Sequence, residues 1–146
     1  MVETPGPQRR VEDVMLRCPK TLPPECTVDQ VRSLFGDDHV HMALIVDARG
    51  NLLTTLEPSD IPADARGAAK AAVFGMVRHR TIDPKLPADV ATAVLQAAGR
   101  RRLAVVDGRG KLLGLLCLKR TGLGFCSDAG VASRAAERGT CSTRAG

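Results

Sequence analysis

The sequence predicts an α/β (α+β) fold in which two pseudo-symmetric β-α-β-β-α motifs pack through their sheets into one compact module. A hairpin pattern over residues 41–57 returns at residues 101–117 without a gap, and an amphipathic helical pattern precedes each copy. The chain has 146 residues, which is enough for one shared core. A single three-stranded layer would leave one apolar face uncovered, whereas two copies bury these faces against each other.

The repeated stretch consists of an apolar run, a turn and a second apolar run. The first copy reads HMALIVDARGNLLTTLE, and the second reads RRLAVVDGRGKLLGLLC. Asp47 and Gly50 in the first turn correspond to Asp107 and Gly110 in the second. Glycine in a tight hairpin turn supplies the positive φ that other residues adopt rarely. Each copy therefore predicts a pair of antiparallel strands.

The first unit is expected to follow a flexible lead-in at residues 1–10. Thr27 and Gln30 form a capping-box pattern at the start of its helix, and Pro58 suits the first turn of a helix. Its expected elements are an ordered start at 11–15, a strand at 21–22, a helix at 27–35, strands at 42–46 and 52–56, and helix or linker at 63–74.

The second unit repeats this order at an offset of sixty residues, so that Thr81 and Ile82 match Thr21 and Leu22. Its expected elements are a strand at 81–82, a helix at 90–97, strands at 103–106 and 112–116, and a last short helix at 127–138. The expected domain boundaries are a lead-in at 1–10, a first motif at 11–75, a second motif at 76–128, and a C-terminal helix or flexible tail at 129–146.

Composition and charge argue against several classes of function. Three Phe residues, with no Tyr and no Trp, provide few stacking platforms for bases or sugars. The net charge of +5 comes from basic residues spread along the chain, so nucleic-acid binding is not expected. No apolar run is long enough to span a bilayer, and residues 1–10 lack the apolar core of a secretory signal. A cytoplasmic protein without a membrane segment is expected.

The sequence predicts no metal site and no catalytic site. His39 and His41 would share one face of a strand, but the sequence identifies no third metal ligand beside them. It contains no G-x-S-x-G, P-loop or H-E-x-x-H pattern, so no enzyme is expected. The cysteines are expected to be apolar fillers or inert thiols rather than a disulfide framework or a zinc site. The five lie at Cys18, Cys26, Cys117, Cys126 and Cys141.

In their order, spacing and repetition, these elements resemble a tandem pair of cystathionine beta-synthase (CBS) domains, the arrangement called a Bateman module. The resemblance covers about residues 11–125. It rests on Val-Glu-Asp-Val-Met at 11–15, on Ala-Leu-Ile-Val-Asp at 43–47 and Leu-Ala-Val-Val-Asp at 103–107, and on the turns and outer strands at 50–60 and 110–120.

The resemblance implies a module that binds AMP, ADP, ATP or S-adenosylmethionine in clefts between its motifs. Family members hold the ribose diol with an Asp after the outer strand, and a hydroxyl three residues earlier often contacts phosphate. The first motif keeps Asp60, with Ser59 beside it, but has Glu57 at the hydroxyl position, where a carboxylate would repel phosphate. The second motif has Cys117 and Arg120 at these two positions, so one competent cleft at most is expected.

The same resemblance supplies further candidate ligand-binding residues, and each of them also has an ordinary structural role. Core or strand-end packing is the default role of Thr21, Leu22, Pro23 and Leu44. An exposed basic linker explains His79 and Arg80 as well as ligand contact does, and the remaining candidate is Arg120. Asp60 also suits the first turn of a helix, where an acid complements the dipole. The basic run at residues 100–102 is expected to be a solvated edge, or to face an anion or a partner.

These observations leave competing functions. The first is a stand-alone regulatory module that requires no cofactor, senses an adenosine-containing ligand, and signals through a homodimer or a separate regulated protein. The second is a ligand-independent dimerisation or interaction scaffold whose nucleotide sites have decayed, which Glu57, Cys117 and Arg120 favour. A third and weaker reading is nucleic-acid binding through the basic charge, which would depend steeply on salt.

Overall fold

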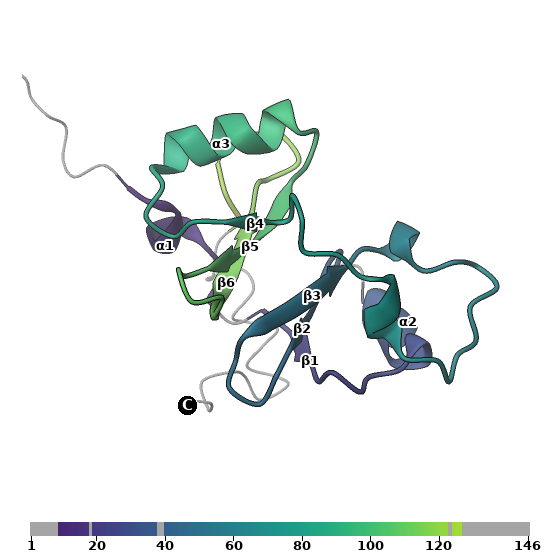
Figure 1. The fold of residues 1–146 in the computed structure, drawn as a ribbon. Helices are drawn as coiled ribbons and strands as arrows, with labels where there is room; N and C mark the ends of the chain where they lie inside the picture. Colours follow the sequence, from purple (N-terminus) through teal and green to yellow (C-terminus); the bar gives the residue numbers. More distant parts are fainter. Residues whose placement is uncertain (1–8, 18, 38–39, 123, 127–146) are drawn as a thin grey trace, which may run out of the picture.

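The computed structural model describes most of the chain (Figure 1). The described residues are 9–17, 19–37, 40–122 and 124–126. Most of the expected lead-in, residues Cys18, His39 and Cys141, and the helix expected at 127–138 lie outside these ranges. Within the described ranges, no helix has both the length and the apolar character that a membrane crossing requires.

Two three-stranded sheets form the frame of the molecule, and they share one topology. In the first, β1 (Thr21–Leu22) pairs in parallel with β2 (Ala43–Val46), which pairs antiparallel with β3 (Leu52–Leu56). In the second, β4 (Thr81–Ile82) pairs in parallel with β5 (Arg102–Val106), which pairs antiparallel with β6 (Leu112–Cys117). The mixed fold and the strands expected from the repeated hairpin are confirmed.

A helix joins the first two strands of each sheet. In α2 (Val28–Phe35) the Thr27 hydroxyl accepts from the Gln30 N–H at 3.3 Å, and the Gln30 side-chain oxygen accepts from the Thr27 N–H at 2.9 Å. These bonds form the expected capping box and satisfy two N–H groups at the start of the helix. The second helix, α3 (Ala88–Ala97), ends before Gly99, which has a φ of +67°.

The helix that the β-α-β-β-α order places after β3 is reduced to two 3-10 turns, η1 (Pro58–Asp60) and η2 (Ala71–Phe74). The backbone carbonyls between them serve α2 instead of a helix of their own. Val28 N–H donates to the Ala69 carbonyl and Asp29 N–H donates to the Gly67 carbonyl. These bonds satisfy further N–H groups of α2 that have no partner within the helix. After β6, the described residues 118–122 and 124–126 also contain no helix.

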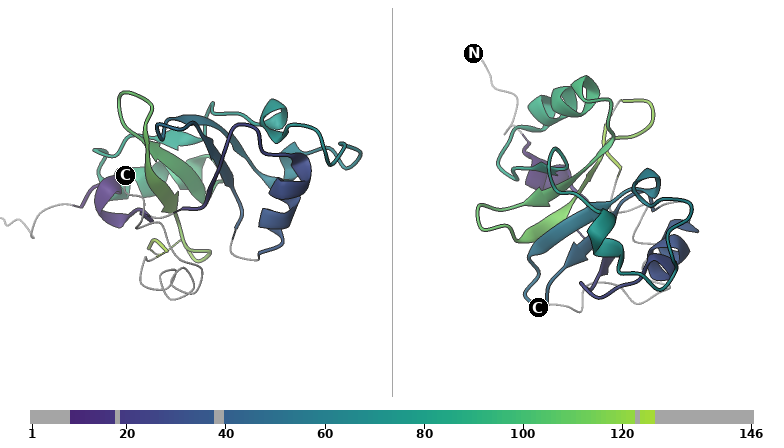
Figure 2. Two further views of the ribbon diagram at one scale, coloured as in Figure 1. Left: turned by 90° about the horizontal axis from the view of Figure 1, so that it is seen from below. Right: turned by 45° about the vertical axis from the view of Figure 1, so that its right-hand side comes forward.

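Residues 9–16, which precede β1, pack on the second unit. In α1 (Val11–Val14), Val11 N–H donates to the Leu86 carbonyl at 2.9 Å, and Leu16 forms a bridge with Leu115 of β6. Figures 1 and 2 place this purple helix beside α3 and the second sheet. Sixty residues later, Ala71 N–H donates to the Cys26 carbonyl, and Met76 forms a bridge with Thr55 of β3. Each sheet is therefore extended by the segment that precedes the other unit in the chain.

The two sheets meet through an apolar cluster between their middle strands, supported by the two hairpin turns. Leu52 N–H donates to the Gly110 carbonyl at 2.9 Å, and Leu112 N–H donates to the Gly50 carbonyl at 3.0 Å. Residues at matching positions of the two units thus exchange hydrogen bonds across a pseudo-two-fold axis. The cluster contains Met42, Leu44 and Ala104, with Leu52, Leu112 and Leu115 packed against them.

We expect Leu44→Ala to lower the free energy of unfolding by about 2 to 5 kcal/mol, because Leu44 is fully buried between the sheets and its loss leaves a cavity. Urea denaturation followed by circular dichroism measures this change. Leu53→Ala is the matched control, since Leu53 is 43% exposed and its truncation is expected to cost about 0.5 kcal/mol. Equal losses in the two variants would contradict the packing described above.

Candidate functional site

A cavity of about 370 Å³ lies where the end of β3 meets the entrance to β5. The backbone there is set by the end of α3. Gly99 N–H donates to the Gln96 carbonyl, and Arg100 N–H donates to the Leu95 carbonyl at 2.9 Å. These two bonds, around a glycine of positive φ, form a Schellman motif that reverses the chain. The cavity is lined by His41, Glu57, Ala98, Gly99, Arg100, Arg101 and Arg102.

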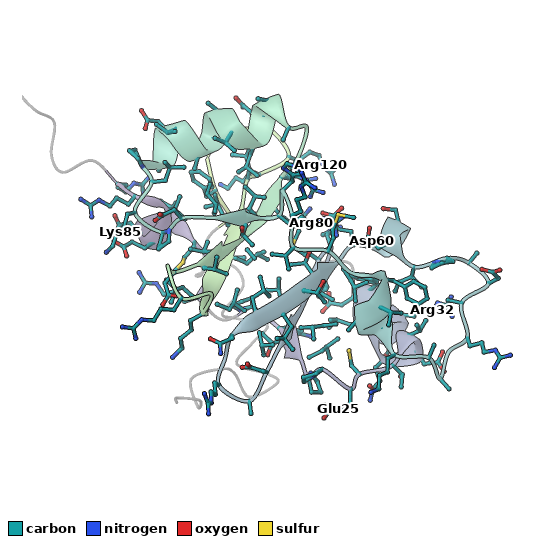
Figure 3. All side chains as sticks on the ribbon, viewed as in Figure 1. Glu25, Arg32, Asp60, Arg80, Lys85 and Arg120 are labelled. Atoms are coloured by element: carbon teal, nitrogen blue, oxygen red, sulfur yellow. A yellow bond between two sulfur atoms is a disulfide. The ribbon has the colours of Figure 1, made fainter. Side chains whose placement is uncertain are left out.

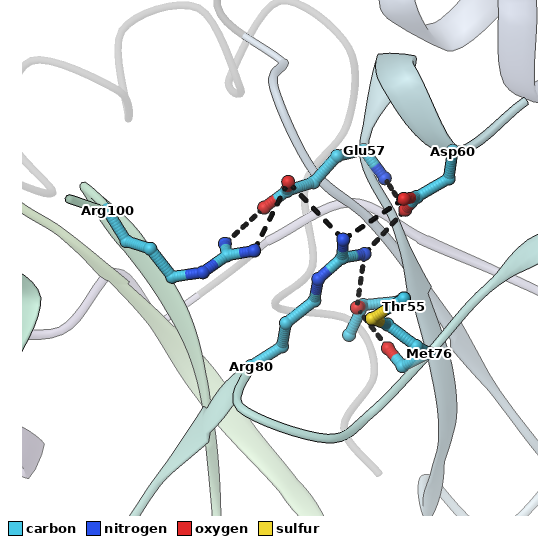
Figure 4. Close-up of polar contacts among 6 residues, drawn as sticks. All are labelled: Thr55, Glu57, Asp60, Met76, Arg80 and Arg100. Atoms are coloured by element: carbon cyan, nitrogen blue, oxygen red, sulfur yellow. Dashed lines mark hydrogen bonds and ion pairs between the residues drawn. The ribbon is translucent and has the colours of Figure 1, made fainter. Parts of the chain in front are cut away.

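Four charged side chains form a continuous network that begins on the cavity wall, and they come from both units (Figure 4). Arg100 Nη1 lies 2.5 Å from Glu57 Oε2, and Arg80 Nη2 lies 3.5 Å from Glu57 Oε1. Arg80 also holds both oxygens of Asp60, at 2.5 Å to Oδ2 and 3.0 Å to Oδ1. The network therefore joins two guanidinium groups to two carboxylates, and its formal charges balance.

Arg80 is the buried centre of the network, with 4% of its surface exposed. Its Nη1 lies 3.5 Å from the Thr55 hydroxyl, which donates in turn to the Met76 carbonyl at 2.6 Å. Its Nε has no partner among the described residues. His79, directly before it, has a φ of +65°, so Arg80 enters the site from a sharp bend ahead of β4. A buried charge is costly unless it is paired, and Asp60 and Glu57 supply that pairing.

The surroundings of Asp60 favour its ionised form. Burial raises the pKa of Asp60, but hydrogen bonds from Arg80 and from the Glu57 N–H, with the charges of Arg80 and Arg100, outweigh this effect. The pKa of this carboxyl therefore lies below its ordinary value of 3.8. In return, the hydrogen bond to Asp60 raises the pKa of Arg80. Both groups are charged at neutral pH.

Arg102 contrasts with Arg80, because its side chain makes no hydrogen bond or ion pair within the described ranges. Burial and then the neighbouring charge of Arg101 lower the pKa of Arg102, and the opposite charge of Glu57 offsets only part of this effect. Arg101 Nε donates to the Leu118 carbonyl at 3.3 Å. Two adjacent guanidinium groups on one cavity wall, one of them without an ion pair in this part of the chain, form a site that favours an anion.

The structure brings together only some of the residues that sequence reasoning named. Glu57, Asp60 and Arg80 share the network, and Ser59 is exposed beside them in η1. His79 is exposed next to Arg80. For these residues, a role as ligand contacts stays a prediction. The repulsion expected between Glu57 and phosphate is offset, because two guanidinium groups neutralise this carboxylate.

Of the candidate ligand residues predicted from the sequence, Glu57 lines the cavity and the others do not. Leu44 is fully buried in the cluster between the sheets, and Thr21 lies opposite it in the register of β1 and β2. Leu22 is half-buried and packs against the core of the first unit, and Pro23 is exposed beyond β1. Arg120 is exposed after β6. Their roles as ligand contacts likewise stay predictions.

Sequence reasoning left the role of Arg100, Arg101 and Arg102 open, and it did not foresee the pairing of Asp60 with Arg80. The side chains of the three consecutive arginines line one cavity because the Schellman turn and the start of β5 place them there. The available signal was a glycine after an amphipathic helix, followed at once by three basic residues.

The expectation of inert cysteines is wrong for one pair, because Cys117 and Cys126 form a disulfide. Leu118 and Phe125 form an antiparallel bridge, and Cys126 N–H donates to the Cys117 carbonyl at 2.7 Å, so the backbone brings the two sulfurs together. Cys117 occupies the place in the second unit that Glu57 holds in the first. Cys26 is a buried free thiol. No three His, Cys, Asp or Glu side chains of the described ranges are grouped to hold a metal.

We expect Asp60→Asn to lower the free energy of unfolding at pH 7 by about 3 to 5 kcal/mol, because it leaves the buried charge of Arg80 without its main partner. A carboxyl whose pKa is depressed by folding stabilises the protein above its ordinary pKa, and this contribution is lost as the pH falls through the folded value. The difference from wild type should therefore shrink below pH 3.8. Denaturation across pH 7 to 2.5, with the exposed Asp64→Asn as control, measures it. A difference independent of pH would contradict the pairing.

We expect Cys126→Ser to lower the free energy of unfolding under oxidising conditions by about 2 to 3 kcal/mol, because the disulfide joins residues nine apart and restricts the unfolded chain. The difference from wild type should disappear in dithiothreitol. Peptide mapping without reductant should recover one linked pair containing Cys117 and Cys126. Recovery of both as free thiols from oxidised protein would contradict the disulfide.

Comparison with known proteins places this fold. No family model matches the chain, and no curated protein matches it. Solved structures do match, at sequence identities that show the fold alone. A CBS domain protein from Pyrobaculum aerophilum, complexed with AMP, gives a TM-score of 0.64 at 20% identity over 78% of this chain and 95% of that one. CBSX2 in complex with AMP gives a TM-score of 0.67 at 20% identity over 86% of this chain and 97% of that one.

The cytosolic domain of the Mg2+ channel MgtE, in complex with ATP, gives a TM-score of 0.65 at 16% identity over 75% of this chain. The match spans 46% of that longer chain. At 75% to 86% coverage of this chain, the likeness extends across both units. The chain therefore has the fold of a tandem CBS domain pair, the Bateman module.

Proposed function

We propose that this chain is a regulatory module that binds an adenosine nucleotide through its phosphates in the cavity beside Arg100, Arg101 and Arg102. One observation carries the proposal: Arg102 is partly buried on the cavity wall beside Arg101 and forms no ion pair among the described residues. A phosphate would supply a partner at ion-pair distance and would fit the planar fork of a guanidinium. The bound states of the AMP and ATP complexes with this fold support the same ligand class.

The size of the cavity suits such a ligand. Its volume of about 370 Å³ lies within the range of small-molecule sites, about 300 to 1,000 Å³. Its charged side chains favour AMP, ADP or ATP over S-adenosylmethionine, whose sulfonium and amino groups are positive. A cationic ligand would be repelled by the arginines of the wall.

Asp60 has a limited part in this proposal. Its Oδ2 accepts from Arg80 and from the Glu57 N–H, whereas its Oδ1 accepts from Arg80 alone. A carboxylate oxygen has two acceptor sites, so Oδ1 keeps one for a ribose hydroxyl. We infer that phosphate contacts dominate recognition and that Asp60, which lies beside the cavity and not on its wall, contributes at most one hydroxyl contact.

The module would act on a partner, either a second copy of the chain in a homodimer or a separate regulated protein. The likeness to the cytosolic domain of a channel supports a regulated partner. No feature of the cavity calls for catalysis, and the proposal assigns none to this chain.

A ligand-independent interaction scaffold is the second candidate, and one observation favours it. The network of Arg80, Arg100, Glu57 and Asp60 is already neutral, so those four groups need no ligand to balance their charge. In the second unit, the place that matches Glu57 holds a disulfide-bonded cysteine. A scaffold would bind its partner with the same affinity whether nucleotide is present or absent.

We expect Arg102→Gln to weaken ATP and AMP binding by about tenfold to a hundredfold, since a hydrogen bond to a charged group contributes about 1.5 to 3 kcal/mol. Isothermal titration calorimetry of wild type and variant measures this change. Arg109→Gln removes the same charge from an exposed turn and should leave the affinity unchanged. Equal affinities in all three proteins would place the ligand elsewhere. No binding to wild type would favour the scaffold.

A further inference from the structure

Glu57 is the single acid among the residues that line the cavity. Its carboxylate faces Arg100, as Figure 4 shows, and the shorter of their two contacts is 2.5 Å. A carboxylate and a phosphate both bind a guanidinium through the same pair of N–H groups. Glu57 therefore occupies the group on Arg100 that an incoming phosphate would use.

We propose that Glu57 determines ligand specificity by acting as an internal competitor for Arg100, so that the cavity selects polyphosphate ligands over ligands of lower charge. This inference rests on the proposed function, because it concerns the same cavity. A single carboxylate is already in place, and a ligand gains affinity at Arg100 only if it displaces that carboxylate. A di- or triphosphate does so while also reaching Arg101 and Arg102, whereas a monophosphate has fewer groups to offer.

The exposure of the four network residues shows which pair can open. The side chains of Glu57 and Arg100 are 23% and 22% exposed, whereas those of Arg80 and Asp60 are 5% and 10% exposed. An ion pair that solvent reaches is easier to exchange for a solvent ion, whereas a buried pair is costly to separate. The Glu57–Arg100 pair is thus the exchangeable part of the network, and the Arg80–Asp60 pair is its fixed part.

The network also provides a place for the displaced carboxylate. Glu57 Oε1 already lies 3.5 Å from Arg80 Nη2, so rotation of the side chain toward Arg80 keeps its charge paired. The backbone need not move, because the Glu57 N–H stays bound to Asp60 Oδ2 at 2.7 Å. Displacement then exchanges one guanidinium partner for another and leaves no buried charge alone.

The test compares wild type, Glu57→Gln and Glu25→Gln by isothermal titration calorimetry with inorganic triphosphate, ATP and adenosine. Glu25→Gln is the matched control, because it removes the same charge from an exposed residue, and Figure 3 places Glu25 far from the Asp60–Arg80 pair. We expect Glu57→Gln to bind triphosphate and ATP at least about tenfold more tightly than wild type. Glu25→Gln should match wild type, and adenosine, which carries no phosphate, should bind all three proteins equally.

A second variant keeps the test valid if Glu57→Gln disturbs the fold. Glu57→Asp retains the charge but shortens the side chain, so it withdraws the carboxylate from Arg100 and should raise triphosphate affinity in the same direction. Thermal unfolding of each variant verifies the fold. Triphosphate affinity that is unchanged or weaker in both Glu57 variants would overturn the inference.

The outcomes separate this inference from the proposed function. If ATP binds wild type and both Glu57 variants equally, the inference fails and the nucleotide proposal stands. If the Glu57 variants gain triphosphate affinity but ATP binds no better than triphosphate in any protein, the internal competitor stands and nucleotide recognition fails. If none of the proteins binds any of these anions, both are overturned.

Discussion

Each three-stranded sheet has an apolar face that it cannot bury by itself, and the mutual burial of these two faces is the constraint on which the rest of the structure depends. Leu44 and Ala104, at the centres of β2 and β5, are fully buried against each other's strands. The hydrogen bonds exchanged between Leu52 and Gly110, and between Leu112 and Gly50, fix the relative register of the sheets. Burial supplies most of the free energy here, and these directional bonds select one arrangement among several apolar ones.

The position of the cavity follows from this packing. Because the sheets meet through their middle strands, the end of β3 in one unit lies beside the entrance to β5 in the other, and Glu57 reaches Arg100. The crossing segments reinforce the arrangement, since residues 9–16 extend the second sheet and residues 69–76 extend the first. The site thus depends on both units, although the three arginines that line the cavity all follow β4 in the chain.

The sequence was sufficient for the features that local patterns determine, and insufficient for those that depend on packing between segments. The duplicated turn at Gly50 and Gly110, and the capping box at Thr27, are local, and the structure contains them as expected. The sequence predicts helix or linker at residues 63–74. The structure has turns there, because α2 and Arg32 use backbone carbonyls within residues 62–69. The pairing of Asp60 with Arg80 spans twenty residues and two units, so no spacing rule indicates it.

The two units meet at a junction between the end of β3 and the entrance to β5. The charges at this junction bear on whether this fold binds a ligand or only holds a partner. Arg80, Arg100, Glu57 and Asp60 cancel one another, so this network alone explains a stable junction without any ligand. Arg102 is not included in that balance, since its partly buried guanidinium lies beside Arg101 with no ion pair in the described part of the chain. An anion would lower this electrostatic cost. Because Glu57 and Arg100 belong to different units, an anion that takes Arg100 also removes a contact between them. Ligand binding and the strength of the junction are then thermodynamically linked, as a regulatory module requires.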